Sequence, residues 1–154
     1  MKRHLTNRQS ELNDITLWHM FAVIVTGNGI LTTINAAQRF NMFSAQSAAA
    51  NGDKFLYRFY LTPGDYNLNM LYVRNSNCGI LTLTVTDENG NDERENTQTD
   101  MYFASVQYNQ SYLSSFSINR EGVYRLVGEI TGHTAPSSGY TCPITMFMLH
   151  KHLE

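Results

Sequence analysis

The stretch VYRLVGEITGHTAPSSGYTCPITMFMLHK, residues 123–151, carries the pattern that decides the fold class of this chain. It begins and ends with a predicted strand, and a glycine-bounded loop separates the two. The first strand alternates apolar and polar residues, as a strand does when one face lies in a core and the other in solvent. The last strand, residues 144–149, is apolar at almost every position, so both of its faces need cover. One face is predicted to carry Ile144, Met146 and Met148, and the other Phe147 and Leu149.

Short strand candidates follow one another along the rest of the chain. Residues 54–61 alternate most clearly, and the Thr62-Pro63-Gly64-Asp65 segment after them is a tight turn, because proline presets φ and glycine accepts a positive value. The polar stretches 44–52 and 88–100 are predicted as loops. This series predicts an all-β chain, an antiparallel β-sandwich of jelly-roll type with about eight to ten strands. The other strand candidates are residues 17–26, 30–34, 39–43, 65–74, 79–87, 101–105 and 113–118.

Length and composition favour one domain. A chain of 154 residues can bury a single core, and a charged fraction of 16% with 12% aromatic residues suits strands better than a helical bundle. Residues 1–16 are predicted as a polar N-terminal leader and residues 17–152 as the sandwich domain. The leader is either a frayed terminus or a short docking or trimerising helix, since its apolar residues have roughly heptad spacing. We treat Leu153-Glu154 as a remnant of a purification tag.

Several classes of function are disfavoured by the sequence. The net charge is −2 and the eleven basic residues are dispersed, so no surface for nucleic acid is predicted. The apolar run 17–25 is too short for membrane insertion and comes too late for a signal peptide, so we expect synthesis in a cytoplasm. No catalytic or cofactor motif is present, and we expect neither an enzyme nor a cofactor. Cys78 and Cys142 either form a disulfide or remain two unreactive thiols.

Two polar clusters invite comparison with metal sites. His150 and His152 share a strand face, but only Glu154 is near them in the sequence as a further ligand. The acidic loop 87–93 has oxygen donors at alternating positions, but its spacing differs from that of a calcium loop, and Asn89-Gly90 is a common hairpin turn. We therefore predict surface histidines, a hairpin or a solvated loop at residues 87–93, and no metal.

A segment rich in aromatic and amide side chains is the best candidate for a ligand site. Sugar sites in sandwich proteins place an aromatic ring against the apolar face of a pyranose and amide groups against its hydroxyls. The segment QYNQSY, residues 107–112, supplies both in one predicted loop, with Phe103 nearby. Alternatively, the tyrosines pack across the sheet or against a neighbouring subunit. The predicted glycan-binding residues are Tyr102, Tyr108, Asn109, Gln110 and Tyr112.

The first and last strands of the domain share an unusual property, because both are apolar on two faces. Jelly rolls commonly pair their terminal strands, so we expect residues 17–25 and 144–149 to be neighbours. One face of the pair is then expected in an oligomer interface. Alternatively, the leader or residues 44–52 cover it within one subunit. The predicted interface residues are Trp18, Met20, Phe21, Met146, Phe147 and Met148.

The order of these segments resembles a known module. The quoted stretch is preceded by AVIVTGN, FYLTPGDYNLNMLYV, N-x-x-x-GILTLTV and DMYFASVQYNQSYLSSFSI. This order, over about residues 20–150, resembles a jelly-roll module of tail-fibre, head-fibre and other appendage proteins of tailed bacteriophages. It is also similar to the sandwiches related to carbohydrate-binding domains. Relatives usually carry lysine and asparagine where this chain has His133 and Thr134.

The resemblance implies a structural protein of a bacteriophage virion, either capsid-decorating or part of a fibre or tail appendage. Such a module acts by self-assembly, often as a homotrimer, together with other virion proteins. Host-surface or glycan attachment would then gain from multivalency. A stand-alone carbohydrate-binding module is the alternative function. The expected location is the virion.

Overall fold

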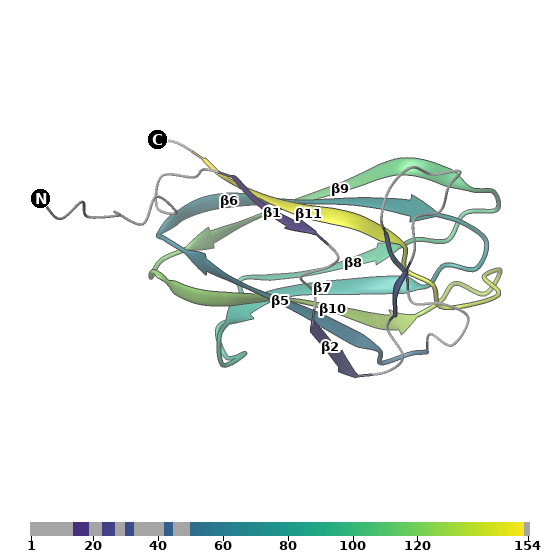
Figure 1. Cartoon of the computed structure of the whole chain (residues 1–154), viewed down its shortest axis with the longest axis horizontal. Helices are drawn as coiled ribbons and strands as arrows, with labels where there is room; N and C mark the ends of the chain where they lie inside the picture. Colours follow the sequence, from purple (N-terminus) through teal and green to yellow (C-terminus); the bar gives the residue numbers. More distant parts are fainter. Residues whose placement is uncertain (1–13, 19–22, 27–29, 33–41, 45–49, 153–154) are drawn as a thin grey trace, which may run out of the picture.

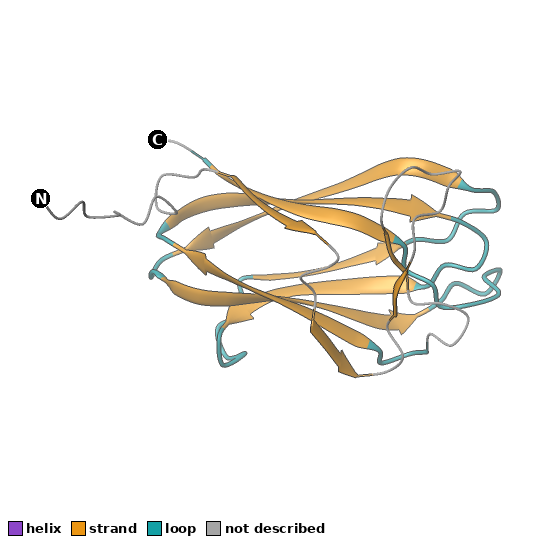
Figure 2. Cartoon of the chain, in the orientation of Figure 1, coloured by secondary structure: helices purple, strands orange, loops and turns teal. Residues whose placement is uncertain are grey.

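The computed structural model describes residues 14–18, 23–26, 30–32, 42–44 and 50–152. Within these ranges the chain forms eleven strands in two antiparallel sheets that face each other (Figure 1). Figure 2 shows only strands and loops in the described residues. The described residues therefore contain no helix that could cross a membrane. The prediction of an all-β antiparallel sandwich is confirmed.

Each sheet is built from strands that are distant in the sequence. Sheet A has the order β3-β4-β11-β6-β9, and β1 also pairs with β11. Sheet B has the order β2-β5-β10-β7-β8. The strands of sheet A are β1 (Asp14–Trp18), β3 (Ile30–Thr32), β4 (Met42–Ser44), β6 (Gly64–Arg74), β9 (Gln107–Ile118) and β11 (Ile144–Lys151). Those of sheet B are β2 (Val23–Thr26), β5 (Lys54–Leu61), β7 (Ile80–Asp87), β8 (Glu95–Asp100) and β10 (Gly122–Gly132).

The core lies between the sheets and is filled by alternate residues of their central strands. Phe147 of β11 contacts two rings of β5, with ring centres 6.1 Å from Phe55 and 5.7 Å from Tyr57. Opposite Phe55, β10 carries Gly128, where a Cβ atom would overlap the Phe55 ring. Glycine is therefore required there to admit the ring. Other fully buried core residues include Leu68, Met70, Leu81, Leu83, Val85 and Leu126.

The first and last strands are neighbours, as predicted. In the antiparallel pair of β1 and β11, Leu17 lies opposite Phe147 and Trp18 opposite Met146. The predicted single strand 17–26 is wrong, however, because the chain forms β1 in sheet A and then β2 in sheet B. A change of sheet explains why this segment is apolar without clean alternation. β1 begins at Asp14, within the stretch predicted as leader, and residues 1–13 lie outside the described residues.

Two further strand predictions are corrected near the middle of the chain. The polar stretch 88–100, predicted as a loop, contains β8, whose polar character fits a strand at the edge of sheet B. Residues 101–105 are not a strand, because Met101 turns into the core and Tyr102 makes only an isolated bridge to Asn75.

A bulge in β11 changes which residues share a face. Ile144 lies opposite Tyr72 and Met146 opposite Leu71, so β11 has one residue more than β6 at this point. Ile144 was predicted on the face of Met146 and Met148, but it is buried in the core with Phe147 and Leu149. Met146 and Met148 are half-buried.

Candidate functional site

Three loops meet at the end of the sandwich on the right of Figure 1. They are the β6–β7 turn (residues 75–79), the β8–β9 loop (residues 101–106) and the β10–β11 loop (residues 133–143). The Phe103 N–H donates to the Asn75 carbonyl at 3.1 Å, which joins the second loop to the first. The third is joined to the first by Ser138 N–H to the Ser76 carbonyl at 3.0 Å and by Gly79 N–H to the Thr141 carbonyl at 2.9 Å. The three loops therefore form one connected unit.

Each of these loops has a side chain that is buried in the core. Cys78, Met101 and Cys142, one from each loop, are fully buried members of the core. Both cysteines are free, and burial raises the pKa of each thiol, so neither is an exposed nucleophile. The Ser137 hydroxyl donates to the Cys78 carbonyl at 2.7 Å, which fixes the glycine-bounded loop onto the β6–β7 turn.

A carboxylate links two loops directly. One oxygen of Asp100 accepts from the Tyr102 N–H at 2.9 Å, and the other accepts from the Thr134 hydroxyl. His133 stands edge-on to Tyr140, with ring centres 4.7 Å apart. The hydroxyl groups of Thr134 and Ser137 in the β10–β11 loop therefore both form hydrogen bonds within the protein.

Two exposed aromatic residues lie at or next to these loops, Phe103 in the β8–β9 loop and Tyr108 at the start of β9, one residue after Gln107, the register partner of Arg74. Phe103 and Tyr108 are 41% and 48% exposed, and Val106 lies between them in the sequence with 48% exposed. The Arg74 guanidinium donates to the Tyr102 carbonyl at 2.7 Å and lies 5.2 Å from the centre of the Phe103 ring. Arg74 forms no ion pair within the described part of the chain. We call the surface formed by Arg74, Tyr102, Phe103 and Tyr108 the aromatic end.

The structure separates the predicted glycan-binding residues into two groups. Tyr102 and Tyr108 lie at the aromatic end, and Asn109 and Gln110 continue from it along β9. Asn109 has a φ of 55°, which interrupts the regular strand next to Tyr108. Tyr112 faces the core instead, and its hydroxyl hydrogen-bonds the Thr97 hydroxyl of the opposite sheet. Tyr112 therefore holds the two sheets together, and its hydroxyl is already engaged.

The segment QYNQSY was predicted as a loop, and this was wrong. It forms the first half of β9 at the edge of sheet A, pairing with β6. Arg74 was not recognised as part of the site, because the contact to Phe103 joins residues far apart in the sequence. Its position at the end of an alternating strand, just before a turn, was the one available signal.

The predicted interface residues also separate. Phe147 is fully buried against Phe55 and Tyr57, so its side chain belongs to the core of its own chain and cannot reach a neighbour. Trp18 lies opposite Met146 in the β1–β11 register. The side chains of Met146 and Met148 are half-buried. Met20 and Phe21 lie outside the described residues.

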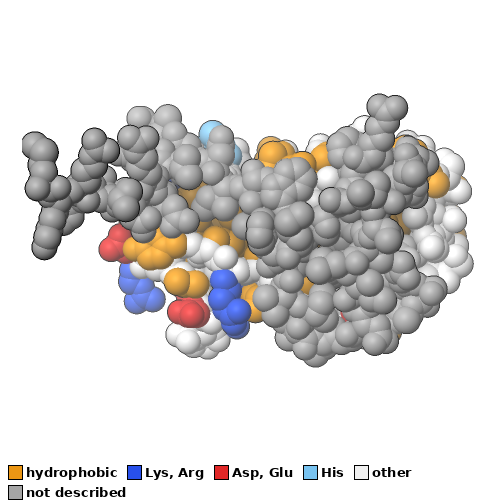
Figure 3. Space-filling view, in the orientation of Figure 1, with side chains coloured by type: hydrophobic (Ala, Val, Ile, Leu, Met, Phe, Trp, Pro, Cys, Tyr) orange, Lys and Arg blue, Asp and Glu red, His pale blue; other side chains and the backbone are white. Residues whose placement is uncertain are grey.

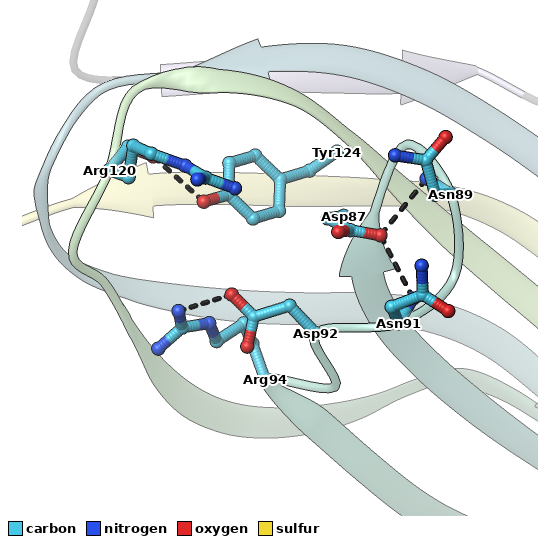
Figure 4. Close-up of polar contacts among 7 residues, drawn as sticks. All are labelled: Asp87, Asn89, Asn91, Asp92, Arg94, Arg120 and Tyr124. Carbon is cyan, nitrogen blue, oxygen red and sulfur yellow. Dashed lines mark hydrogen bonds and ion pairs between the residues drawn. The ribbon is translucent and has the colours of Figure 1, made fainter.

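The acidic stretch 87–93 forms the tip of the β7–β8 hairpin (Figure 4). One oxygen of Asp87 accepts from the Asn89 and Asn91 N–H groups, each at 2.9 Å. These backbone hydrogen bonds, that of Asn91 foremost, lower the pKa of Asp87. Arg94 pairs with Asp92. The structure thus agrees with the hairpin prediction, and no group of three metal-ligating side chains occurs within the described ranges.

Comparison with known proteins gives similarity in structure alone. No protein-family model and no curated protein matches the sequence. Xanthan lyase from Paenibacillus is similar with a TM-score of 0.68 at 18% identity, over 89% of this chain and 13% of the lyase. The CBM36-1 domain of a xylanase from the hindgut metagenome of Trinervitermes trinervoides has a TM-score of 0.59 at 14% identity, over 92% of this chain and all of that domain.

An isolated family 35 carbohydrate-binding module from Clostridium thermocellum is also similar, with a TM-score of 0.57 at 15% identity. The alignment covers 92% of this chain and 100% of that module. At such identities the likeness shows a common fold. The chain therefore has the β-sandwich fold found in carbohydrate-binding modules, which confirms that part of the resemblance. The bacteriophage part stays a prediction.

Proposed function

We propose that this protein is a carbohydrate-binding module that holds a neutral glycan against the aromatic end. The observation that carries the proposal is the pair of exposed rings, Phe103 on a loop that is tied to the β6–β7 turn and Tyr108 at the start of β9. A rigid, exposed ring can pack against the apolar face of a pyranose without losing conformational freedom on binding. The similarity to isolated carbohydrate-binding modules supports the same function.

The roles of the individual residues follow from their positions. Phe103 is held by Arg74 beneath its ring and by its own backbone bond to Asn75, so it is the fixed plate of the site. Tyr108 offers a second ring and a hydroxyl. Asn109 is exposed on β9 and supplies an amide for the sugar hydroxyls, whereas Gln110 is partly exposed and its amide nitrogen already donates to the Tyr108 carbonyl at 3.0 Å, which leaves its amide oxygen for the sugar.

The proposal is tested by glycan-array screening followed by calorimetric titration of the best neutral oligosaccharide. Phe103→Ala and Tyr108→Ala are each expected to weaken binding about tenfold, because each removes a stacking ring. Leu113→Ala is the matched control, since it removes a side chain that is 61% exposed on the same strand as Tyr108. Binding that survives both aromatic substitutions would place the glycan elsewhere.

A second candidate is the self-assembling bacteriophage virion component, located in the virion with other virion proteins as partners. The observation that favours it is the outer face of sheet A. In its register Met148, Asn69 and Leu113 lie side by side on adjacent strands, and Met146 is next to Leu71. Equilibrium sedimentation tests this candidate: a trimer that Met146→Asp and Leu113→Asp dissociate is expected, whereas a monomer at micromolar concentration contradicts it.

A further inference from the structure

Two arginines occupy directly opposed positions on the outer face of sheet B. Arg58 of β5 is the register partner of Arg125 of β10, and both strands lie inside the sheet rather than at its edge. Opposed residues in an antiparallel pair project from the same face with Cβ atoms about 5 Å apart, and like charges placed so are destabilising. We call Arg58 and Arg125 the arginine pair.

Nothing in the described structure neutralises the arginine pair. The ion pairs found there are Lys54 with Glu129, at 2.9 Å, and Arg94 with Asp92. Lys54 of this sheet and Arg94 of the β7–β8 loop thus have an acidic partner, while Arg58 and Arg125 have none among the described residues. The Nε atom of Arg125 is also buried without a hydrogen-bond acceptor. Because that atom is buried, an anion on the outer face would contact the terminal nitrogens of Arg125 and the exposed Arg58 instead.

The fold holds the Arg125 guanidinium in place. The hairpin tip of Figure 4, organised by the Asp87 carboxylate, brings Gly90 against it. Gly90 has a φ of +84°, and a Cβ atom there would overlap the guanidinium group. The turn therefore leaves room for Arg125 and limits where its donors can point. A preorganised guanidinium binds a carboxylate or sulfate with two parallel hydrogen bonds.

An exposed aromatic ring stands beside the arginine pair. Tyr60 lies two positions beyond Arg58 on the same face of β5, opposite Val123, and is 51% exposed. Its pKa is raised, by desolvation first and then by the nearby Glu121 carboxylate. A ring for the apolar face of a sugar, next to donors for an anionic substituent, is the combination that an acidic sugar requires.

We propose that the outer face of sheet B is a second binding surface, for a polysaccharide that carries carboxylate or sulfate groups. Arg58 and Arg125 bind the anionic group, and Tyr60 packs against the sugar ring. This surface is distinct from the aromatic end, and the inference rests on the proposed function only in taking the ligand to be a carbohydrate.

The test measures binding of polygalacturonate and of heparin, a carboxylate and a sulfate polymer, to the whole chain by calorimetry. The unmodified protein is expected to bind at least one of them, more weakly as salt rises. The double variant R58Q/R125Q is expected to lose about tenfold or more in affinity, and Arg58→Gln alone about threefold. Lys54→Gln is the matched control, because it removes one positive charge from the same sheet outside the pair and is expected to change affinity less than about twofold.

Several results would overturn the inference. The first is that the unmodified protein binds neither polymer. The second is that Lys54→Gln loses as much affinity as the arginine variants. The third is that duplex DNA binds as tightly as the acidic polymers and depends on the arginine pair in the same way. Arg58 is exposed, so Arg58→Gln keeps the test valid even if the double variant unfolds. Phe103→Ala serves to separate the two proposals. If no neutral glycan binds but polygalacturonate binding depends on the arginine pair, the aromatic end fails as a site and this surface stands.

Discussion

Sheet A and sheet B present different chemistry to solvent, although both contribute alternate residues to the same core. In Figure 3 the visible acidic and basic side chains lie mostly toward sheet B, while hydrophobic side chains appear on both sides and a histidine toward sheet A. The outward positions of sheet A include Leu71, Leu113, Met146 and Met148, whereas those of sheet B include Lys54, Arg58, Arg125 and Glu129.

Because the two outer faces differ, the outward residues of each sheet are where we look for binding surfaces. The inward residues are constrained by packing, since any change of volume there is costly. The outward residues are free of that constraint, so an unpaired arginine pair or a row of methionines and leucines needs another explanation. For sheet A we propose contact with further copies of the chain, and for sheet B contact with an anionic ligand.

The largest expected effect separates the inside of β11 from its outside. Phe147→Ala should lower the free energy of unfolding by about 3–5 kcal/mol, because it empties a space between Phe55 and Tyr57. Met146→Ala, one residue away on the outer face, should cost less than about 1 kcal/mol. Urea unfolding followed by tryptophan fluorescence measures both. Equal losses would mean that Met146 is as tightly packed as Phe147, and the distinction between faces would fail.

A smaller effect is expected inside sheet B. Gly128→Ala places a methyl group against the Phe55 ring and should cost about 1–3 kcal/mol by overpacking. Gly122→Ala in the same strand is the control, because a Cβ atom there meets nothing within 4 Å. It should change stability by less than about 0.5 kcal/mol. Thermal unfolding compares the two variants, and a Gly128→Ala protein as stable as the control contradicts the proposed role of Phe55.

The sequence predicted the parts of this fold in which alternation is undisturbed. Residues 54–61 were predicted as a strand and form β5 over the same bounds. The misses share one physical cause, which is pairing between distant segments. The bulge at Ile144 depends on β6, and the strand character of residues 95–100 depends on pairing with β7. Neither the bulge nor the strand over residues 95–100 changes the apolar–polar alternation that a sequence pattern can detect.

The aromatic end was only partly predictable for the same reason. The sequence singled out Tyr102 and Tyr108 because tyrosines near amide residues suggest sugar binding, and that role stays a prediction. Tyr112 has the same neighbours in sequence, but the contact with Thr97 of the opposite sheet decides its role. The arginine pair could not be foreseen at all, since Arg58 and Arg125 are opposed only through the β5–β10 register.

A further substitution changes the charge of the sheet B face without disturbing the core. Arg58→Glu replaces a like-charge pair with an opposite-charge pair against Arg125, and should stabilise the fold by about 0.2–1 kcal/mol. The same change should abolish binding of the acidic polymers. Thermal unfolding at low and high salt measures the first effect, which should shrink as salt increases. A loss of stability would mean that the two guanidinium groups do not repel each other in the folded protein.

The smallest expected effect concerns the hairpin that supports Arg125. Because the pKa of Asp87 is lower in the folded chain than its ordinary value, its ionised form stabilises folding. That contribution is complete above about pH 4, the unfolded value, and is lost as the pH falls through the lower folded value. Asp87→Asn should therefore unfold at a lower temperature than the unmodified protein at pH 7, with the gap closing as the pH falls below about 3. The control is Asp65→Asn, which changes an exposed aspartate on sheet A. A difference in unfolding temperature that stays constant with pH would show that the charge of Asp87 does not stabilise the turn. The position of Arg125 would then not depend on the charge of Asp87.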